Sequence, residues 1–191
     1  MSKLGKHTEA SKCFDRTLEI DPNNSVTWNN KGFALYLLGK YREAIRMYDN
    51  ALEIDPTNET AWTNKSMALS SMGELAEASK CIDRILETDP NNVNAWYNKG
   101  FLFDQLGKDA EAIESYDKAL ELDPNHVPAL GNKGLTLYSL KKYSEAIDCF
   151  NRILEVDPKN ANAWQNKGAI LKALGRNREA DECYDKADAL R

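Results

Sequence analysis

The chain has 191 residues, of which 42% are hydrophobic and 29% charged, and its 25 basic and 30 acidic side chains give a net charge of −5. This mild negative charge argues against non-specific binding to nucleic acid or to an anionic membrane, because both require a basic surface. No apolar run approaches the ~18–20 residues that span a bilayer. We therefore expect neither a nucleic-acid partner nor a membrane partner.

One pattern recurs along the chain with a period of 34 residues. Residues 1–24 carry only its later part, so we predict a half repeat there that consists of a second helix. Five further units are predicted, at 25–58, 59–92, 93–126, 127–160 and 161–191. The period is visible in three sets of equivalent residues: Pro22, Pro56, Pro90, Pro124 and Pro158; Ala10, Ala44, Ala78, Ala112, Ala146 and Ala180; Asn30, Asn64, Asn98, Asn132 and Asn166. A strict period without insertions predicts one supersecondary unit stacked on copies of itself.

Each unit reads as two helices joined by a short turn. In the unit 25–58, apolar residues at helical spacing predict a first helix over 26–38 and a second over 41–54. Gly39 suits the turn, since a residue just past a helix C-terminus often has a positive φ. Pro56 ends the second helix because proline cannot continue it. One such hairpin cannot bury its apolar stripe alone, so its neighbours must stack on it.

The residues at fixed positions of the unit resemble the tetratricopeptide repeat (TPR) family. The matching residues of the unit 25–58 are Trp28, Gly32, Ala44, Tyr48, Ala51 and Pro56. The resemblance implies an all-α fold, a right-handed α-solenoid of helix-turn-helix 34-residue repeats (a TPR superhelix), as one continuous domain. Ser66, Leu130 and Lys141 depart from the pattern. A lysine also stands at the seventh position of each complete unit, and we expect its stem to be buried and its ammonium to reach water.

The resemblance also implies where a partner would bind. In this family the first helices line an inner, concave groove, and the sixth position of each unit faces it. That position holds Asn30, Asn64, Asn98, Asn132 and Asn166. An asparagine side chain donates and accepts, so such a row can pair with the backbone of an extended peptide, similar to the asparagine ladder of the protein O-linked N-acetylglucosamine transferase. The same residues could instead cap or cross-link neighbouring first helices, and both roles stay open.

An apolar stripe is predicted beside this row. Its members are Phe33, Met67 and Phe101 at the ninth position, together with Tyr36, Tyr97 and Tyr138. Aromatic and methionine side chains on a groove wall are typical of a contact surface. The alternative is that they pack against the neighbouring first helix.

Little in the sequence indicates catalysis or a cofactor. The two histidines, His7 and His126, have no visible nucleophilic partner, and no Cys/His spacing is typical of zinc. The four cysteines, Cys13, Cys81, Cys149 and Cys183, occupy equivalent slots, which predicts small buried thiols in a reducing compartment, and we expect a cytoplasmic protein.

We therefore interpret the chain as a non-enzymatic scaffold or adaptor that binds a peptide segment of another protein in its groove. Two other functions stay open. The chain could be the recognition part of a larger enzyme such as a glycosyltransferase, or a scaffold that self-associates end to end through its open ends.

Overall fold

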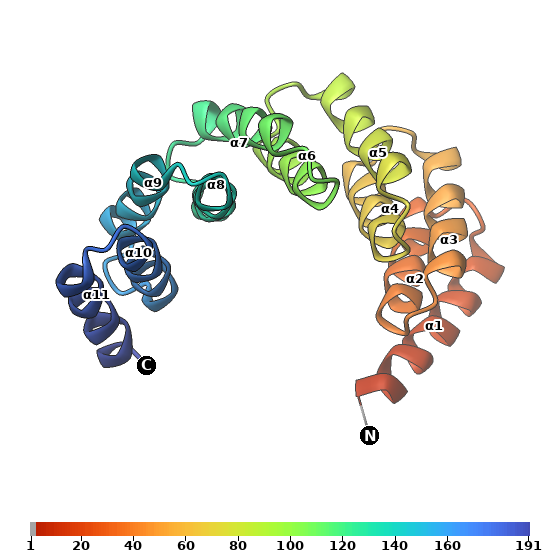
Figure 1. Ribbon diagram of the computed structural model, residues 1–191. Coiled ribbons are helices and arrows are strands. Elements are labelled where there is room, and N and C mark those ends of the chain that lie inside the picture. Colours follow the sequence, from red (N-terminus) through yellow and green to blue (C-terminus); the bar gives the residue numbers. More distant parts are fainter. Residues whose placement is uncertain (1–2) are drawn as a thin grey trace. The chain divides into compact units, whose positions relative to one another are not determined.

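The computed structural model describes the backbone of residues 3–191 and the side chains from His7 onward. These residues form α-helices joined by short turns, and no strand occurs among them (Figure 1). The predicted fold class, an all-α helical-repeat solenoid, is confirmed. The helices are α1 (Lys3–Ile20), α2 (Ser25–Leu37), α3 (Tyr41–Ile54), α4 (Glu59–Ser71), α5 (Leu75–Thr88), α6 (Val93–Gln105), α7 (Asp109–Leu122), α8 (Val127–Ser139), α9 (Tyr143–Val156), α10 (Ala161–Ala173) and α11 (Asn177–Ala189).

The helices group into two compact units. The first unit ends at Ala95 and the second comprises Trp96–Arg191. In the first unit, α2 packs against α3, α4 against α5, and α2 also contacts α1 and α4. In the second unit, α8 packs against α9 and α10 against α11, while α8 contacts α7 and α10 contacts α9. Sequential helices are therefore neighbours, as expected for stacked hairpins.

The start of each first helix is set by the last residue of the preceding 34-residue segment. The side chain of Asn24 accepts a hydrogen bond from the Thr27 N–H at 2.9 Å, and Asn58, Asn92 and Asn160 make the equivalent bond. At the start of α8 the same role falls to His126, whose Nδ1 accepts from the Ala129 N–H at 3.2 Å. These side chains satisfy one of the four N–H groups that lack a partner inside a helix.

Glycine and an aromatic ring share the crossing point of the paired helices. A Cβ on Gly32 would lie 2.5 Å from the Tyr48 ring, and one on Gly100 would lie 2.6 Å from the Tyr116 ring. Only glycine lets the two backbones approach around these rings. Ser66 is compatible with its site because the facing residue is Ile82 instead of an aromatic, and its hydroxyl donates to the Ala78 carbonyl at 3.0 Å.

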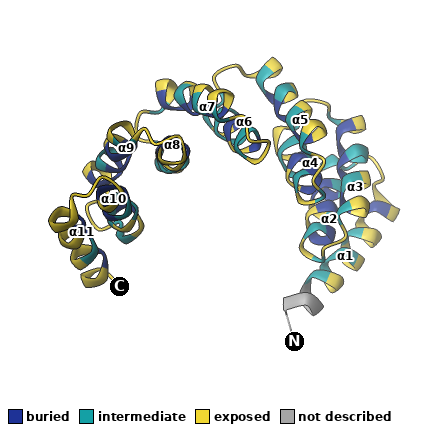
Figure 2. Cartoon of the chain, in the orientation of Figure 1, coloured by how far each residue is buried: buried dark blue, intermediate teal, exposed yellow. Residues whose placement is uncertain are grey.

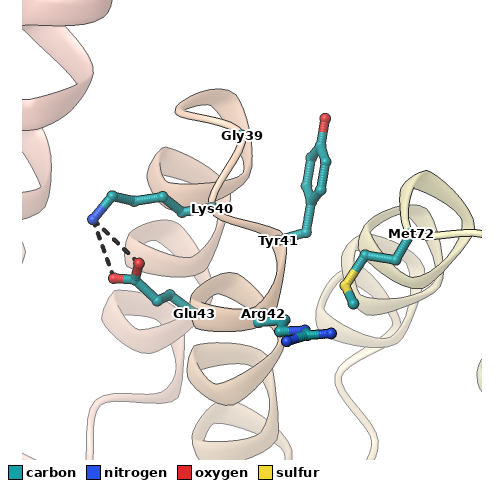
Figure 3. A pocket seen from close by; sticks show the side chains of 6 residues that line it. All are labelled: Gly39, Lys40, Tyr41, Arg42, Glu43 and Met72. Carbon is teal, nitrogen blue, oxygen red and sulfur yellow. Dashed lines mark hydrogen bonds and ion pairs between the residues drawn. The ribbon is translucent and has the colours of Figure 1, made fainter.

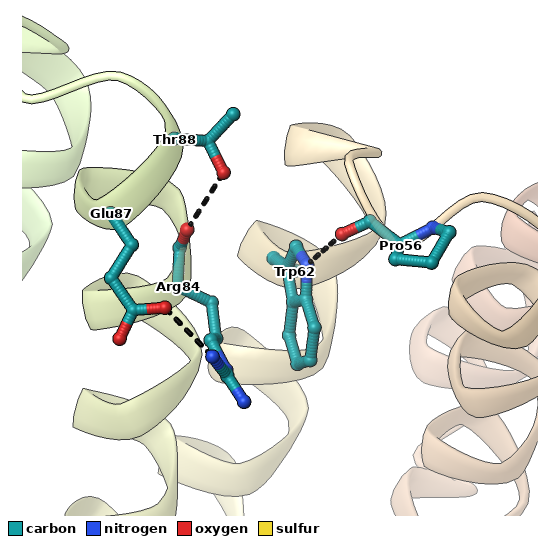
Figure 4. Close-up of polar contacts among 5 residues, drawn as sticks. All are labelled: Pro56, Trp62, Arg84, Glu87 and Thr88. Atoms are coloured by element: carbon teal, nitrogen blue, oxygen red, sulfur yellow. Dashed lines mark hydrogen bonds and ion pairs between the residues drawn. The ribbon is translucent and has the colours of Figure 1, made fainter.

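Tryptophan at the fourth position of a repeat forms a hydrogen bond with the proline turn that precedes the repeat. The indole N–H of Trp28 donates to the Pro22 carbonyl at 2.8 Å, and that of Trp62 donates to the Pro56 carbonyl at 2.9 Å. Figure 4 shows the second of these bonds beside the Arg84–Glu87 pair. The side chain of Leu130 has no N–H, and there the guanidinium of Arg152 donates to the Pro124 carbonyl at 2.6 Å. The structure thus compensates for the missing tryptophan.

The seventh-position lysines join neighbouring repeats by ion pairs. Lys31 lies 2.6 Å from Asp15, Lys65 lies 2.6 Å from Asp49, and the lysine side chains are only 19% and 21% exposed. Each ammonium also lies above the tryptophan ring three residues earlier, at 5.4 Å for Lys31 and 5.3 Å for Lys65. The stems are covered as expected, and each ammonium group also binds a carboxylate and lies over a ring face.

Candidate protein-binding surface

The residues predicted to face a partner lie on the first helices of the hairpins. We call this surface the first-helix face and define it by the second, fifth, sixth, ninth, twelfth and thirteenth positions of each unit, which follow one another at helical spacing. Its residues are Val26, Asn29, Asn30, Phe33, Tyr36 and Leu37 on α2; Thr60, Thr63, Asn64, Met67, Ser70 and Ser71 on α4; Asn94, Tyr97, Asn98, Phe101, Asp104 and Gln105 on α6; Pro128, Gly131, Asn132, Leu135, Tyr138 and Ser139 on α8; Asn162, Gln165, Asn166, Ala169, Lys172 and Ala173 on α10.

Large apolar side chains are exposed at the ninth position of four first helices. Phe33 is 41% exposed, Met67 43%, Phe101 44% and Leu135 46%. Ala169 takes the same place on α10 and is half-buried. The interior of the fold is filled by other positions, since Ala34 and Leu35 beside Phe33 are 5% and 7% exposed. Figure 2 shows this division of buried and exposed residues along each helix. Each ninth-position side chain therefore keeps a large apolar surface that the packing of the helices leaves uncovered.

In the first unit, aromatic rings continue this surface toward the end of α2. The Phe33 and Tyr36 rings are stacked, with centroids 6.3 Å apart and 14° between their planes. Tyr36 also contacts the Tyr41 ring at 5.4 Å, and its hydroxyl lies 3.4 Å from the Ser71 hydroxyl on α4. Phe33 and Tyr36 are thereby held in place before any ligand arrives.

The sixth-position amides make bonds between repeats. Asn64 Nδ2 donates to Asn29 Oδ1 at 3.0 Å in the first unit, and Asn132 Nδ2 donates to the Tyr97 hydroxyl at 3.4 Å in the second. Both acceptors stand at the fifth position of the preceding first helix. Asn30 is exposed, while Asn98 and Asn166 are half-buried. The fifth-position counterpart for Asn166 is Gly131, which has no side chain. In both observed bonds the amide nitrogen is the donor, so the oxygen of the same amide is the group available to a ligand N–H.

Tyr97 and Tyr138 differ in their surroundings. Tyr138 is 38% exposed and its ring lies 5.7 Å from that of Tyr143, as Tyr36 lies beside Tyr41. Tyr97 is half-buried, with ring contacts to Tyr116 at 6.2 Å and to His126 at 5.3 Å. Tyr97 is thus packed against other side chains of the second unit, while the Tyr138 ring is open to a ligand.

A hollow at the turn between α2 and α3 lies beside this surface. It has a volume of about 300 Å³ and is lined by Gly39, Lys40, Tyr41, Arg42, Glu43 and Met72. Figure 3 shows Lys40 and Glu43 turned toward each other on one side and Met72 on the other. The Lys40 ammonium lies 3.2 Å from the Glu43 carboxylate, so these two charges largely compensate each other.

Three of the four cysteines, Cys81, Cys149 and Cys183, are buried as predicted, whereas Cys13 is exposed because it lies on the outer side of α1. Burial raises the pKa of the Cys81 thiol to about 11, and burial also raises the pKa of Cys149 and Cys183. A reactive thiol needs the opposite shift, because the thiolate is the nucleophile. Within the described residues, no cluster of histidine, cysteine, aspartate or glutamate is arranged to hold a metal ion. No helix among these residues is both long and apolar enough to cross a membrane.

Three sequence models described as tetratricopeptide repeat match the chain. One matches residues 93–126 and 127–160, the second 35–99, and the third 13–46 and 149–182. Together they extend without a gap from residue 13 to residue 182. The chain belongs to the tetratricopeptide repeat family.

Solved structures of other TPR proteins have the same fold. A TPR protein from Parabacteroides merdae ATCC 43184 matches with a TM-score of 0.80 at 23% identity, covering 97% of this chain and 73% of the other. MamA matches with a TM-score of 0.74 at 22% identity, covering 83% and 93%. YrrB, described as a TPR protein with an unusual peptide-binding site, matches with a TM-score of 0.69 at 25% identity, covering 95% and 93%. No curated protein matches the sequence.

Membership of this family gives the general role. TPR repeats are typically non-catalytic interaction modules, and the chain is a protein-interaction scaffold.

Asp104 is a residue of the first-helix face that the sequence analysis did not single out. Asp104 is a carboxylate at the twelfth position, where the other TPR units have Tyr36, Ser70, Tyr138 and Lys172. The sequence could have indicated Asp104, because a carboxylate stands at the twelfth position in this unit alone among the five.

Proposed function

We propose that the first-helix face binds a segment of a partner protein in an extended conformation. The observation that carries this proposal is the exposure of the ninth-position side chains, Phe33 and Met67 in the first unit and Phe101 and Leu135 in the second, each of which presents two-fifths or more of its surface to solvent. Exposed apolar groups of this size, framed by polar amides, are typical of a protein contact surface.

The two kinds of residue on the face have different roles in this proposal. The ninth-position side chains, together with Tyr36 and Tyr138, contact apolar side chains of the partner. The amide oxygens of Asn64, Asn98 and Asn132 accept hydrogen bonds from its backbone N–H groups. Backbone contacts of this kind hold an extended chain without regard to its sequence, while the apolar side chains select it.

The magnitudes indicate moderate affinity. Burying a whole Phe, Met or Leu side chain stabilises by ~1.5–3 kcal/mol, so covering the exposed two-fifths of each of four contributes roughly 3–5 kcal/mol. Three amide hydrogen bonds add about 0.5–1.5 kcal/mol each. Association and ordering of the segment cost several kcal/mol in return. A partner segment therefore needs contacts on several repeats at once.

The proposal is tested with substitutions on exposed apolar residues in two places. The full chain would be used to select dodecapeptides from a displayed random library, and binding of the selected peptides would be measured by calorimetry. Phe101→Ala and Leu135→Ala are each expected to weaken binding about four- to ninefold, since each side chain contributes roughly 0.8–1.3 kcal/mol. The matched controls are Leu122→Ala and Val156→Ala, because these side chains are 40% and 47% exposed but lie at the ends of second helices.

Two results would contradict the proposal. Equal loss of binding in the first-helix and control variants would place the contact elsewhere on the molecule. Light scattering that shows mass rising with protein concentration, with peptide binding absent, would favour self-association as the role of the exposed residues.

A further inference from the structure

The first-helix face is almost uncharged, although 29% of the chain is charged. On α2 and α4, its positions hold only apolar, hydroxyl and amide side chains. In the second unit the charged side chains at these positions are Asp104 on α6 and Lys172 on α10. Asp104 stands one helical turn after the exposed Phe101, on the same side of α6.

The Asp104 carboxylate is held by hydroxyl groups from two other helices. The Tyr116 hydroxyl on α7 donates to Oδ2 at 2.5 Å. The Thr136 hydroxyl on α8 lies 2.8 Å from Oδ1 and shares its hydrogen with the Asn132 carbonyl at 2.9 Å. Each carboxylate oxygen thus has one neutral donor, and a carboxylate has room for about two more. The group is fixed in position and half-buried, and no ion pair among the described side chains includes its charge.

A ligand that covers Phe101 and Leu135 also withdraws water from Asp104. A neutral segment would leave the carboxylate desolvated with two hydroxyl bonds, which costs free energy, and an acidic segment would add repulsion. A guanidinium or ammonium group supplies the opposite charge, and a guanidinium can form two parallel bonds to a carboxylate. Charge complementarity therefore favours a cationic side chain at this place.

We infer that the second unit binds a partner segment that carries an arginine or lysine next to apolar residues, with Asp104 as its counter-ion. This inference rests on the proposed function and adds selectivity to it. The first unit has Tyr36 and Ser70 at the equivalent positions, so its part of the face takes an uncharged segment. The selectivity for a cationic side chain is therefore local to α6 and α8.

The experiment compares peptide selection by the full chain and by three variants, using the displayed dodecapeptide library. Asp104→Asn removes the charge and keeps the shape. Thr136→Val removes one of the hydroxyl bonds and keeps the charge. Asp148→Asn removes an exposed carboxylate from α9, away from the first-helix face. Arginine and lysine are expected to be enriched with the unmodified chain, Thr136→Val and Asp148→Asn, but not with Asp104→Asn.

The strongest selected peptide is then synthesised with arginine and with citrulline, its neutral isostere. Citrulline is expected to weaken binding to the unmodified chain about tenfold and to Asp104→Asn less than twofold. The same loss in both would overturn the inference, as would peptides that require Phe101 but show no basic enrichment; Asp104 would then only cross-link the helices. Failure of the proposed function looks different, because no selected peptide would then depend on Phe101.

Discussion

The hydrogen bond between Asn64 and Asn29 separates two roles of the sixth-position asparagines. The bond is 3.0 Å long and partly buried, and it joins α4 to α2. Removing it with Asn64→Ala is expected to lower the free energy of unfolding by about 0.5–1.5 kcal/mol. Asn29 is 6% exposed, so Asn29→Ala should cost at least as much. Because both changes remove the same bond, the double variant should lose less than the sum, with a coupling of ~0.5–1 kcal/mol.

Urea unfolding followed by circular dichroism measures these differences. The matched control is Asn30→Ala, since Asn30 holds the same position on α2 but is exposed. Its effect should stay within about 0.5 kcal/mol. Peptide binding per folded molecule then reports the second role. Asn64→Ala removes the amide oxygen proposed to contact the ligand, whereas Asn29→Ala keeps it, so only Asn64→Ala should weaken binding.

Two outcomes would refute this reasoning. A coupling below about 0.3 kcal/mol would mean that the two amides do not stabilise each other. If Asn29→Ala and Asn64→Ala weakened binding equally, the asparagine would act by supporting the helices and not by contacting the peptide.

Three further predictions concern single residues. Lys141 has φ 60°, where the other turns have glycine, so Lys141→Gly should raise the free energy of unfolding by about 0.5–1 kcal/mol in urea titrations. Burial lowers the pKa of His126 below its usual 6.5, against the attraction of Asp123. The neutral ring that caps α8 therefore stabilises the fold fully above pH 6.5, and this stabilisation is lost as the pH falls through the lowered pKa. Melting temperatures between pH 8 and 5.5 measure this loss. With a colorimetric thiol reagent, the exposed Cys13 should react at once, and the buried Cys81, Cys149 and Cys183 only on unfolding.

Each of these has its own control. Gly175→Ala, at the equivalent turn of the next repeat, should destabilise, because its φ is 77°. His126→Asn should flatten the difference in melting temperature above pH 5.5, since asparagine caps the other first helices without titrating in this range. Cys13→Ser should abolish the fast thiol phase. Unchanged behaviour in these controls would show that the named residue is not the cause.

The repeat alone was enough to predict the helices and the family. A residue such as Pro56 or Gly39 acts locally, because proline ends a helix and glycine permits the turn, whatever surrounds them. Trp28, Gly32 and Tyr48 recur at the same spacing in most units, which indicates that one packing of two short helices is repeated along the chain. The sequence also indicated the first-helix positions that carry Phe33 and Met67, and these are exposed in the structure.

The hydrogen-bond and ion-pair partners of the polar side chains could not be predicted from the sequence. Asn64 bonds to a residue 35 positions earlier and Thr136 to one 32 positions earlier, and no local rule relates them. The ion pair of Lys31 with Asp15 was likewise not predicted, because it forms only where stacking brings the preceding second helix against Lys31.

The amino-acid sequence by itself determined the helices and their pairing, since these follow from a period of 34 residues and from helical geometry. The resemblance to the TPR family then indicated the first-helix positions at which apolar side chains remain exposed. The tertiary structure decided which polar groups are already bonded, as with Asn64, and which charge stays open to a ligand, as with Asp104. The physical reason is that a hydrogen bond or an ion pair depends on distances of a few tenths of an ångström between helices, and these are set only when the repeats are stacked.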